Sequence, residues 1–191
     1  MKSVAPMIVA SCLLLAAAQP PASRKHVESS EETKERPGTG HIYLEKMVGN
    51  WDVSKVYYPR GGDPVRSAGE CRQKMIQDGK FLQSEFIFEQ ADGKSTGQGI
   101  VGFEPESGRF TSFWIDSRQT RMSARQSREP FDGTRIVLYS IALDPQAKES
   151  RRSKTISQLE DNGRKLIHRQ YALGSGGEER LVMELILTRK P

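Results

Sequence analysis

From Trp51 to the end of the chain, apolar and polar residues alternate in short runs that are separated by turn sequences. A period of two is typical of β-strands that bury one face. Asp78-Gly79, Asp92-Gly93 and Asn162-Gly163 are pairs that two-residue hairpin turns favour. The strands predicted in this way cover residues 51–58, 67–77, 80–90, 95–103, 109–116, 120–127, 134–143, 152–159, 165–173 and 180–189.

The predicted strands are consecutive, and no helix-length pattern interrupts them, which argues against a parallel βαβ fold. Such a meander is best closed as a barrel, because closure removes exposed strand edges and makes the first and last strands neighbours. Ahead of it, Ile42 to Val48 has helical spacing, and Gly49 is a natural C-terminal stop. We therefore expect an all-β domain over residues 41–191: an antiparallel up-and-down β-barrel of about ten strands, opened by a short N-terminal helix.

The start of the chain has a different composition. Residues 1–18 combine Lys2, a short apolar run and the small residues Ala16 to Ala18, which is typical of a secretory signal peptide. The run is shorter than the ~20 residues of a transmembrane segment, and none is predicted later. Cys12 precedes the main apolar run, so lipoprotein anchoring through it is not expected. Residues 19–40 hold almost nothing to bury and are predicted to be a flexible linker. We expect an exported protein, periplasmic or extracellular after cleavage.

Charge and composition argue against several kinds of partner. The net charge of +5 is mild and spread along the chain, so nucleic acid binding is not indicated. Cleavage would leave Cys71 as the one cysteine, without an internal disulfide. His26, His41 and His168 do not cluster, so neither a metal nor another cofactor is expected. Gly97 to Gly102 matches G-x-G-x-x-G, but no helix follows, and we interpret its glycines as relieving strain in a bent strand.

The two ends of the predicted barrel carry a first resemblance. Gly49-Asn50-Trp51 after a helical turn resembles the Gly-x-Trp opening of the calycin superfamily, the lipocalin and fatty-acid-binding-protein barrels. In those barrels an arginine late in the last strand packs over the tryptophan, and Arg189 has this position. The resemblance implies structural roles for Gly49, Trp51 and Arg189.

A second resemblance covers most of the domain. It rests on segments at residues 44–51, 78–82, 99–105, 114–117 and 183–190, which run in order through the chain. Together they are similar to the domain of unknown function 1579 family of exported bacterial proteins. Because that family has no assigned activity, the similarity implies a barrel and a compartment but no catalytic residue.

Basic and aromatic residues are the candidates for a binding site. Arg121 and Arg125 share one face of the predicted strand at 120–127, but alternation alone does not decide whether this face points inward. Facing inward, an arginine can pair with the acidic head group of a ligand. Trp114, Phe86 and Phe88 are the candidates for an apolar lining.

Three kinds of function remain open. The first is binding of a small apolar or amphipathic ligand inside the barrel. The second is a structural or interaction module whose barrel is filled by side chains and whose basic face meets a partner. The third is an enzyme, although no nucleophile–base pair or metal set is visible. It would require His168 to lie in a cleft beside Asp116 or Glu184.

Overall fold

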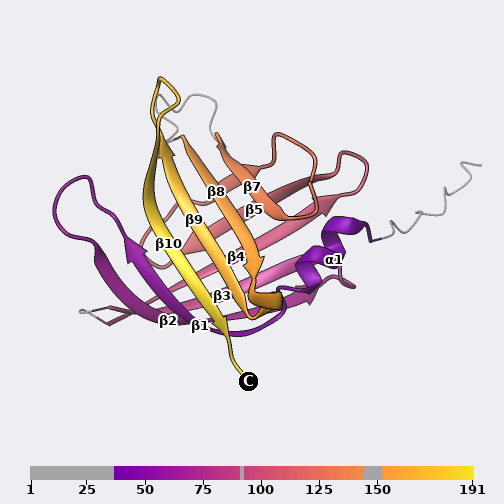
Figure 1. The fold of residues 1–191 in the computed structure, drawn as a ribbon, viewed down its shortest axis with the longest axis horizontal. Coiled ribbons are helices and arrows are strands. Elements are labelled where there is room, and N and C mark those ends of the chain that lie inside the picture. The colour runs from indigo at the N-terminus through magenta and orange to yellow at the C-terminus, as the bar shows by residue number, and fades with distance from the viewer. Residues whose placement is uncertain (1–36, 91–92, 144–151) are drawn as a thin grey trace, which may run out of the picture. The chain divides into compact units, whose positions relative to one another are not determined.

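The computed structural model describes residues 37–90, 93–143 and 152–191. In these residues a short helix precedes ten antiparallel strands that close into a barrel (Figure 1). The elements are α1 (Thr39–Glu45), β1 (Gly49–Tyr57), β2 (Val65–Ile76), β3 (Phe81–Gln90), β4 (Gly93–Glu104), β5 (Arg109–Asp116), β6 (Ser123–Gln126), β7 (Arg135–Ile141), β8 (Ser153–Glu160), β9 (Lys165–Leu173) and β10 (Glu179–Arg189). The predicted all-β, up-and-down barrel is confirmed.

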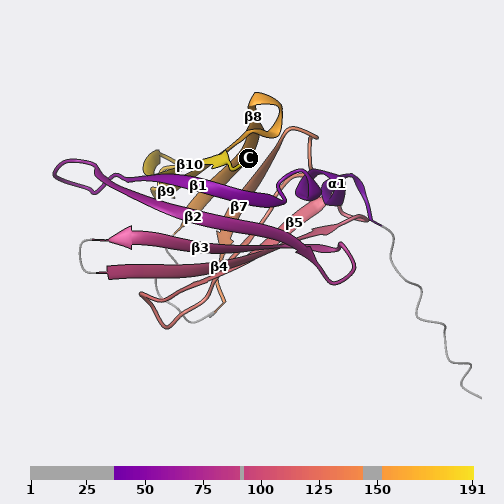
Figure 2. The same cartoon turned by 90° about the horizontal axis from the view of Figure 1, so that it is seen from below.

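Strands that follow one another in sequence are paired, and β1 closes the ring by pairing with β10. Figure 2 shows β1 to β4 running side by side. The register places Trp51 opposite Arg189 on one side and opposite Cys71 on the other. The predicted contact between the first and last strands is therefore confirmed. Each of the ten described strands has a partner on both sides, which removes the unpaired edges that promote association.

The helix lies earlier in the chain than the predicted range of 42–48, and it begins before the domain start predicted at residue 41. His41 Nδ1 accepts a hydrogen bond from the backbone N–H of Gly38 at 2.9 Å, which satisfies a free donor at the helix start. Gly49 is not the helix stop; it is the first residue of β1, with a φ of +151°. No helix in the described ranges has both the length and the apolar character needed to cross a membrane.

Some predictions fall outside the described residues. They concern the signal peptide at residues 1–18, most of the linker at 19–40, and Asp92 of the Asp92-Gly93 turn.

Strand β6 is shorter than the predicted strand at 120–127. After β5, the carboxylate of Asp116 accepts hydrogen bonds from the backbone N–H of Arg118 and from Gln119 Nε2. Such side-chain contacts to nearby backbone favour turns over extended chain. Arg121 therefore lies in the loop before β6 and does not share a strand face with Arg125.

The inward side chains pack most tightly in a core cluster that includes α1. The largest fully buried ones are Trp51, Phe110, Leu44, Leu82 and Leu187. Full burial of one leucine or phenylalanine side chain stabilises a fold by ~1.5–3 kcal/mol. The hydroxyl of Tyr43 in α1 donates to the Thr134 carbonyl at 2.8 Å and accepts from the Leu159 N–H at 3.2 Å. These bonds attach the helix to the ends of β7 and β8.

Arg189 joins the last strand to the chain before β1. Its guanidinium lies 4.1 Å from the Trp51 ring. Its Nε donates to the Gly163 carbonyl at 2.9 Å, and its Nη2 donates to the Lys46 carbonyl at 2.7 Å. A Cβ at position 49 would clash with this guanidinium, so Gly49 is required there for space as well as for its positive φ. Gly49, Trp51 and Arg189 together close one end of the barrel.

Candidate functional site

Beyond this packed end, the barrel encloses a cavity of about 1270 Å³. Its apolar lining includes Met47, Leu82, Phe86, Ile136, Leu166 and Leu187. Pockets that hold small organic ligands typically measure ~300–1,000 Å³, so this cavity has room for one. The second functional hypothesis requires an interior filled by side chains, and the cavity differs from that expectation.

The three predicted aromatic residues lie together on the cavity wall. The rings of Phe86 and Phe88 are stacked with centroids 5.6 Å apart, and the Trp114 ring meets Phe86 edge-on at 5.5 Å. The Trp114 indole lies against Gly97 and Gly99 of β4, and a Cβ at position 97 would clash with it. Neither glycine has a positive φ, so these glycines provide space for the indole rather than backbone freedom.

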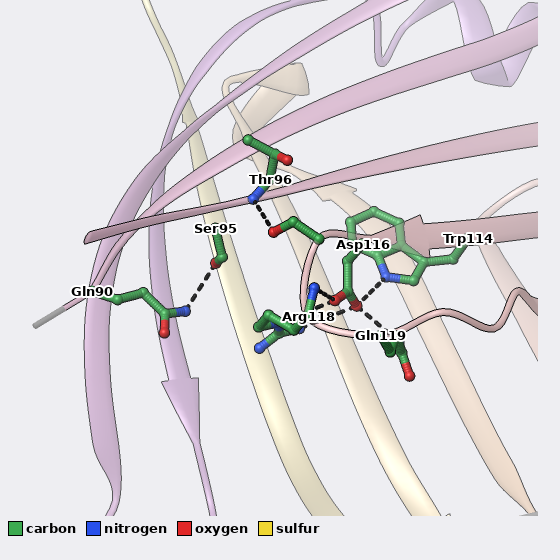
Figure 3. A network of polar contacts seen from close by, with 8 residues as sticks. Gln90, Ser95, Thr96, Trp114, Asp116, Arg118 and Gln119 are labelled. Carbon is green, nitrogen blue, oxygen red and sulfur yellow. Dashed lines mark hydrogen bonds and ion pairs between the residues drawn. The ribbon is translucent and has the colours of Figure 1, made fainter. Parts of the chain in front are cut away.

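Asp116 organises the end of β5 (Figure 3). It accepts hydrogen bonds from Trp114 Nε1 at 3.1 Å, Gln119 Nε2 at 2.8 Å, and both the backbone N–H (2.9 Å) and Nε (3.2 Å) of Arg118. Burial alone would raise the pKa of Asp116, but these bonds, led by those of Arg118, outweigh it and lower the pKa to about 2. The carboxylate is therefore ionised and holds both the indole and the following loop in place.

Arg125 lines the cavity from β6. Its register partners are Ser112 of β5 and Ser140 of β7, which line the same wall. The Nε of Arg125 is buried without a hydrogen-bond partner. Burial lowers the pKa of Arg125, but a guanidinium remains protonated at neutral pH. The cavity wall therefore contains a half-buried cation whose Nε is a buried, unused donor.

The carboxylates that line the cavity do not neutralise this arginine. In the described part of the chain they are Glu89 and Asp116. Glu89 pairs with Lys94 at 3.1 Å, and Asp116 pairs with Arg118 at 3.2 Å. Arg125 is left without an acidic partner among the described residues, and its buried Nε is left without an acceptor, which is costly.

His168 of β9 also lines the cavity, with its Nδ1 2.8 Å from Ser157 Oγ. Burial, with a further contribution from the charge of Arg125, lowers the pKa of His168 to about 4. The imidazole is thus neutral at neutral pH and is a weak base for proton abstraction. The carboxylates considered as its partners are engaged elsewhere: Asp116 in its own network, and Glu184 in an ion pair with an arginine of β9 at 2.6 Å.

Two polar residues of the wall are missing from the sequence-based candidates. Lys55 follows Trp51 on the inward face of β1, is 7% exposed, and places Nζ 4.6 Å from the centroid of the Phe88 ring. Gln73 Nε2 donates to Ser84 Oγ at 2.9 Å, while its Oε1 is buried without a partner. The sequence did contain a signal for Lys55, because it is a lysine on the otherwise apolar face of a predicted strand.

Arg121 differs from Arg125 in its surroundings. It borders the cavity from the exposed loop before β6, together with the exposed side chain of Met122. Of the two arginines proposed for a head group, Arg125 is therefore the less exposed one, with a buried Nε. Among the described residues, no group of three or more histidine, cysteine, aspartate or glutamate side chains is arranged to hold a metal ion.

The fold and the cavity together define a class of protein: a closed ten-strand antiparallel barrel that surrounds a cavity with apolar and basic walls. The family model for "Protein of unknown function (DUF1579)" matches residues 36–189, and the chain belongs to this family.

A solved structure has a similar fold. The crystal structure of Rv2717c from M. tuberculosis matches with a TM-score of 0.56 and 18% sequence identity, and the match covers 82% of this chain and 100% of that chain. At this identity the similarity concerns the fold. No curated protein matches the sequence.

Proposed function

We propose that this protein is an exported binding protein for a small amphipathic molecule with an acidic head group. The observation that carries the proposal is the buried, unpartnered Nε of Arg125 on the wall of a cavity of about 1270 Å³. A ligand carboxylate at this position would supply the missing acceptor and the missing negative charge.

The apolar body of the ligand would lie among the aliphatic and aromatic side chains of the lining, including Phe86, Phe88 and Trp114. Each Å² of apolar surface removed from water contributes ~25 cal/mol, and this term provides most of the affinity. The hydrogen bond to a charged group adds ~1.5–3 kcal/mol and selects acids over neutral compounds. His168 and Gln73 Oε1 offer further polar contacts on the same wall.

Export is supported by the signal-peptide pattern of residues 1–18 and the polar composition of residues 19–40. Cell fractionation with intact-mass measurement tests this part of the proposal. A chain that starts at Gln19 and occurs in the exported fraction is the expected result. A chain that keeps residues 1–18 in the cytoplasm would contradict it.

The binding proposal is tested first by native mass spectrometry of the protein purified from the exported fraction without detergent. An extra mass that disappears on denaturation is expected. The stripped protein is then titrated with hexadecanoic acid and with hexadecanol, with Trp114 fluorescence as a reporter because the indole lines the cavity.

The acid should bind about 10- to 100-fold more tightly than the alcohol, which corresponds to one charge-assisted hydrogen bond. Arg125→Met should remove this preference and leave the alcohol affinity unchanged. Arg121→Met, at the exposed rim, is the matched control and should retain the preference. Equal affinities for acid and alcohol in the wild-type protein would overturn the assignment of an acidic ligand, and failure of both to bind would overturn the proposed binding of a long-chain amphiphile.

A further inference from the structure

Besides Arg125, a lysine of the cavity has no acidic partner among the described residues. Lys55 of β1 is 7% exposed and lines the same cavity. Its Nζ contacts the face of the Phe88 ring at 4.6 Å, and no ion pair joins it to a carboxylate in the described ranges. Burial lowers the pKa of Lys55, the charge of Arg118 lowers it further, and Asp116 acts in the opposite direction. A buried ammonium without a paired carboxylate destabilises the empty barrel.

The two cations belong to opposite sides of the barrel. In the ring of ten strands, β1 and β6 lie five positions apart in either direction. The charges that act on Lys55 are those of Arg118 and Asp116, whereas the charge of Arg125 acts on His168. The cations therefore occupy different parts of one cavity rather than a single cationic cluster.

Apolar side chains line the cavity on the strands next to each cation. Leu185 of β10 is the register partner of Lys55, and Leu138 of β7 is on the strand next to Arg125; both line the cavity. Phe88 lies beneath the lysine Nζ. A chain of methylene groups could cross this surface with its polar ends at the two cations.

We propose that the cavity binds one elongated ligand with an acidic group at each end of an apolar body, one carboxylate on Arg125 and the other on Lys55. The inference rests on the proposed function and adds the second acidic group. A diacid supplies a partner to both cations at once, whereas a monoacid leaves one of them unpaired.

The test compares hexadecanedioic, dodecanedioic and octanedioic acid with the monoacids of the same chain length, by isothermal titration calorimetry on the full chain as exported. The best-fitting diacid should bind with a stoichiometry of one and about 10- to 100-fold more tightly than its monoacid. Lys55→Met should abolish this advantage and leave monoacid affinity unchanged, while Arg125→Met should weaken both. Lys165→Met, at the exposed start of β9 and outside the cavity lining, is the matched control and should behave as wild type.

Each outcome has a distinct meaning. Diacids no better than monoacids, or two monoacids bound per chain, would overturn the two-headed ligand and leave the proposed function standing. Binding of neither class would overturn the proposed function itself. Because methionine fills the space of the lysine stem, Lys55→Met should fold, and a thermal unfolding midpoint at or above that of wild type verifies this. Lys55→Arg should retain the preference for diacids, since it preserves the charge.

Discussion

Replacing Arg125 by methionine should stabilise the ligand-free protein. The Nε of Arg125 is buried without an acceptor, and no carboxylate that the described residues place at the cavity wall is free to pair with it. Methionine has a similar apolar stem and no group that requires a partner. A residue that is present for structure should destabilise the fold when it is replaced, so the sign of the effect separates the two roles.

The size of the effect follows from the unsatisfied donor. A buried polar group without a partner costs ~1–3 kcal/mol, and more when it is charged. The free energy of unfolding should therefore rise by ~1–3 kcal/mol in Arg125→Met, and the melting temperature by ~2–4 °C per kcal/mol for a chain of this size. An acidic ligand present at ~100 times its Kd stabilises the wild-type protein by ~2.7 kcal/mol. The variant should gain much less, so the ligand should remove most or all of the stability difference between the two proteins.

The assay is urea unfolding followed by tryptophan fluorescence, with and without hexadecanoic acid. Arg121→Met is the control, because its exposed side chain should change stability by less than ~0.5 kcal/mol. If Arg125→Met lowers the free energy of unfolding of the ligand-free protein by more than ~1 kcal/mol, Arg125 has a structural partner and the reasoning is refuted.

Four further predictions follow from the packing and the titrating groups. Gly97→Ala should destabilise the protein by ~1–3 kcal/mol, because its Cβ would overlap the Trp114 indole; an unchanged urea midpoint would contradict this. The folded pKa of Asp116 is about 2 against an ordinary 3.8, so the stability that its carboxylate contributes is complete above about pH 4 and is lost as pH falls towards 2. In urea unfolding, the loss of stability caused by Asp116→Asn should therefore shrink by ~1–2 kcal/mol over that range. A loss that stays constant with pH would count against this prediction. The pKa of His168 falls from 6.5 to about 4 on folding, so the unfolded state binds more protons between these pH values. The free energy of unfolding of the wild-type protein should therefore drop by up to ~3 kcal/mol as pH falls from 6.5 to 4, and that of His168→Asn should drop by less. An equal acid sensitivity of the two proteins would argue against this prediction. Burial raises the pKa of the Cys71 thiol, so a thiol-specific chromogenic reagent should label it in urea and not in buffer, whereas rapid labelling of the native chain would show that the thiol is exposed.

The strand order could be predicted because two local signals agree along most of the chain. Alternation marks each strand, and turn pairs such as Asp78-Gly79 mark where the chain reverses, with positive φ at both residues in the structure. The prediction was wrong about the length of β6 because the loop before it is shaped by one side chain, that of Asp116. Its five hydrogen-bond donors come from positions 114, 118 and 119, which periodicity does not connect.

The site could be predicted only in part, for a similar reason. A period of two assigns residues to two faces but does not state which face is inside, so Arg125 could not be separated from a solvated arginine. Arg121 is four residues before Arg125, as the alternation requires, but it lies in the loop before β6 rather than in a strand. Lys55 could have been found, because it shares a strand face with the buried Trp51 and Val53, and a lysine in that position contradicts the apolar pattern around it.

Under the proposed function, the polar groups of the cavity wall are features retained for binding. Within the part of the chain that the structure describes, Arg125 Nε and Gln73 Oε1 are buried without partners, and Lys55 is buried without an ion pair. Each destabilises the empty barrel, and a hydrophobic residue of similar volume at any of the three positions would relieve the penalty. Local conflicts of this kind are expected where function opposes stability. All three lie on the same cavity, and a ligand with acidic and hydrogen-bonding groups would satisfy them together. The closed end has no such conflict: Arg189 has its carbonyl acceptors and the Trp51 ring, and its role is structural.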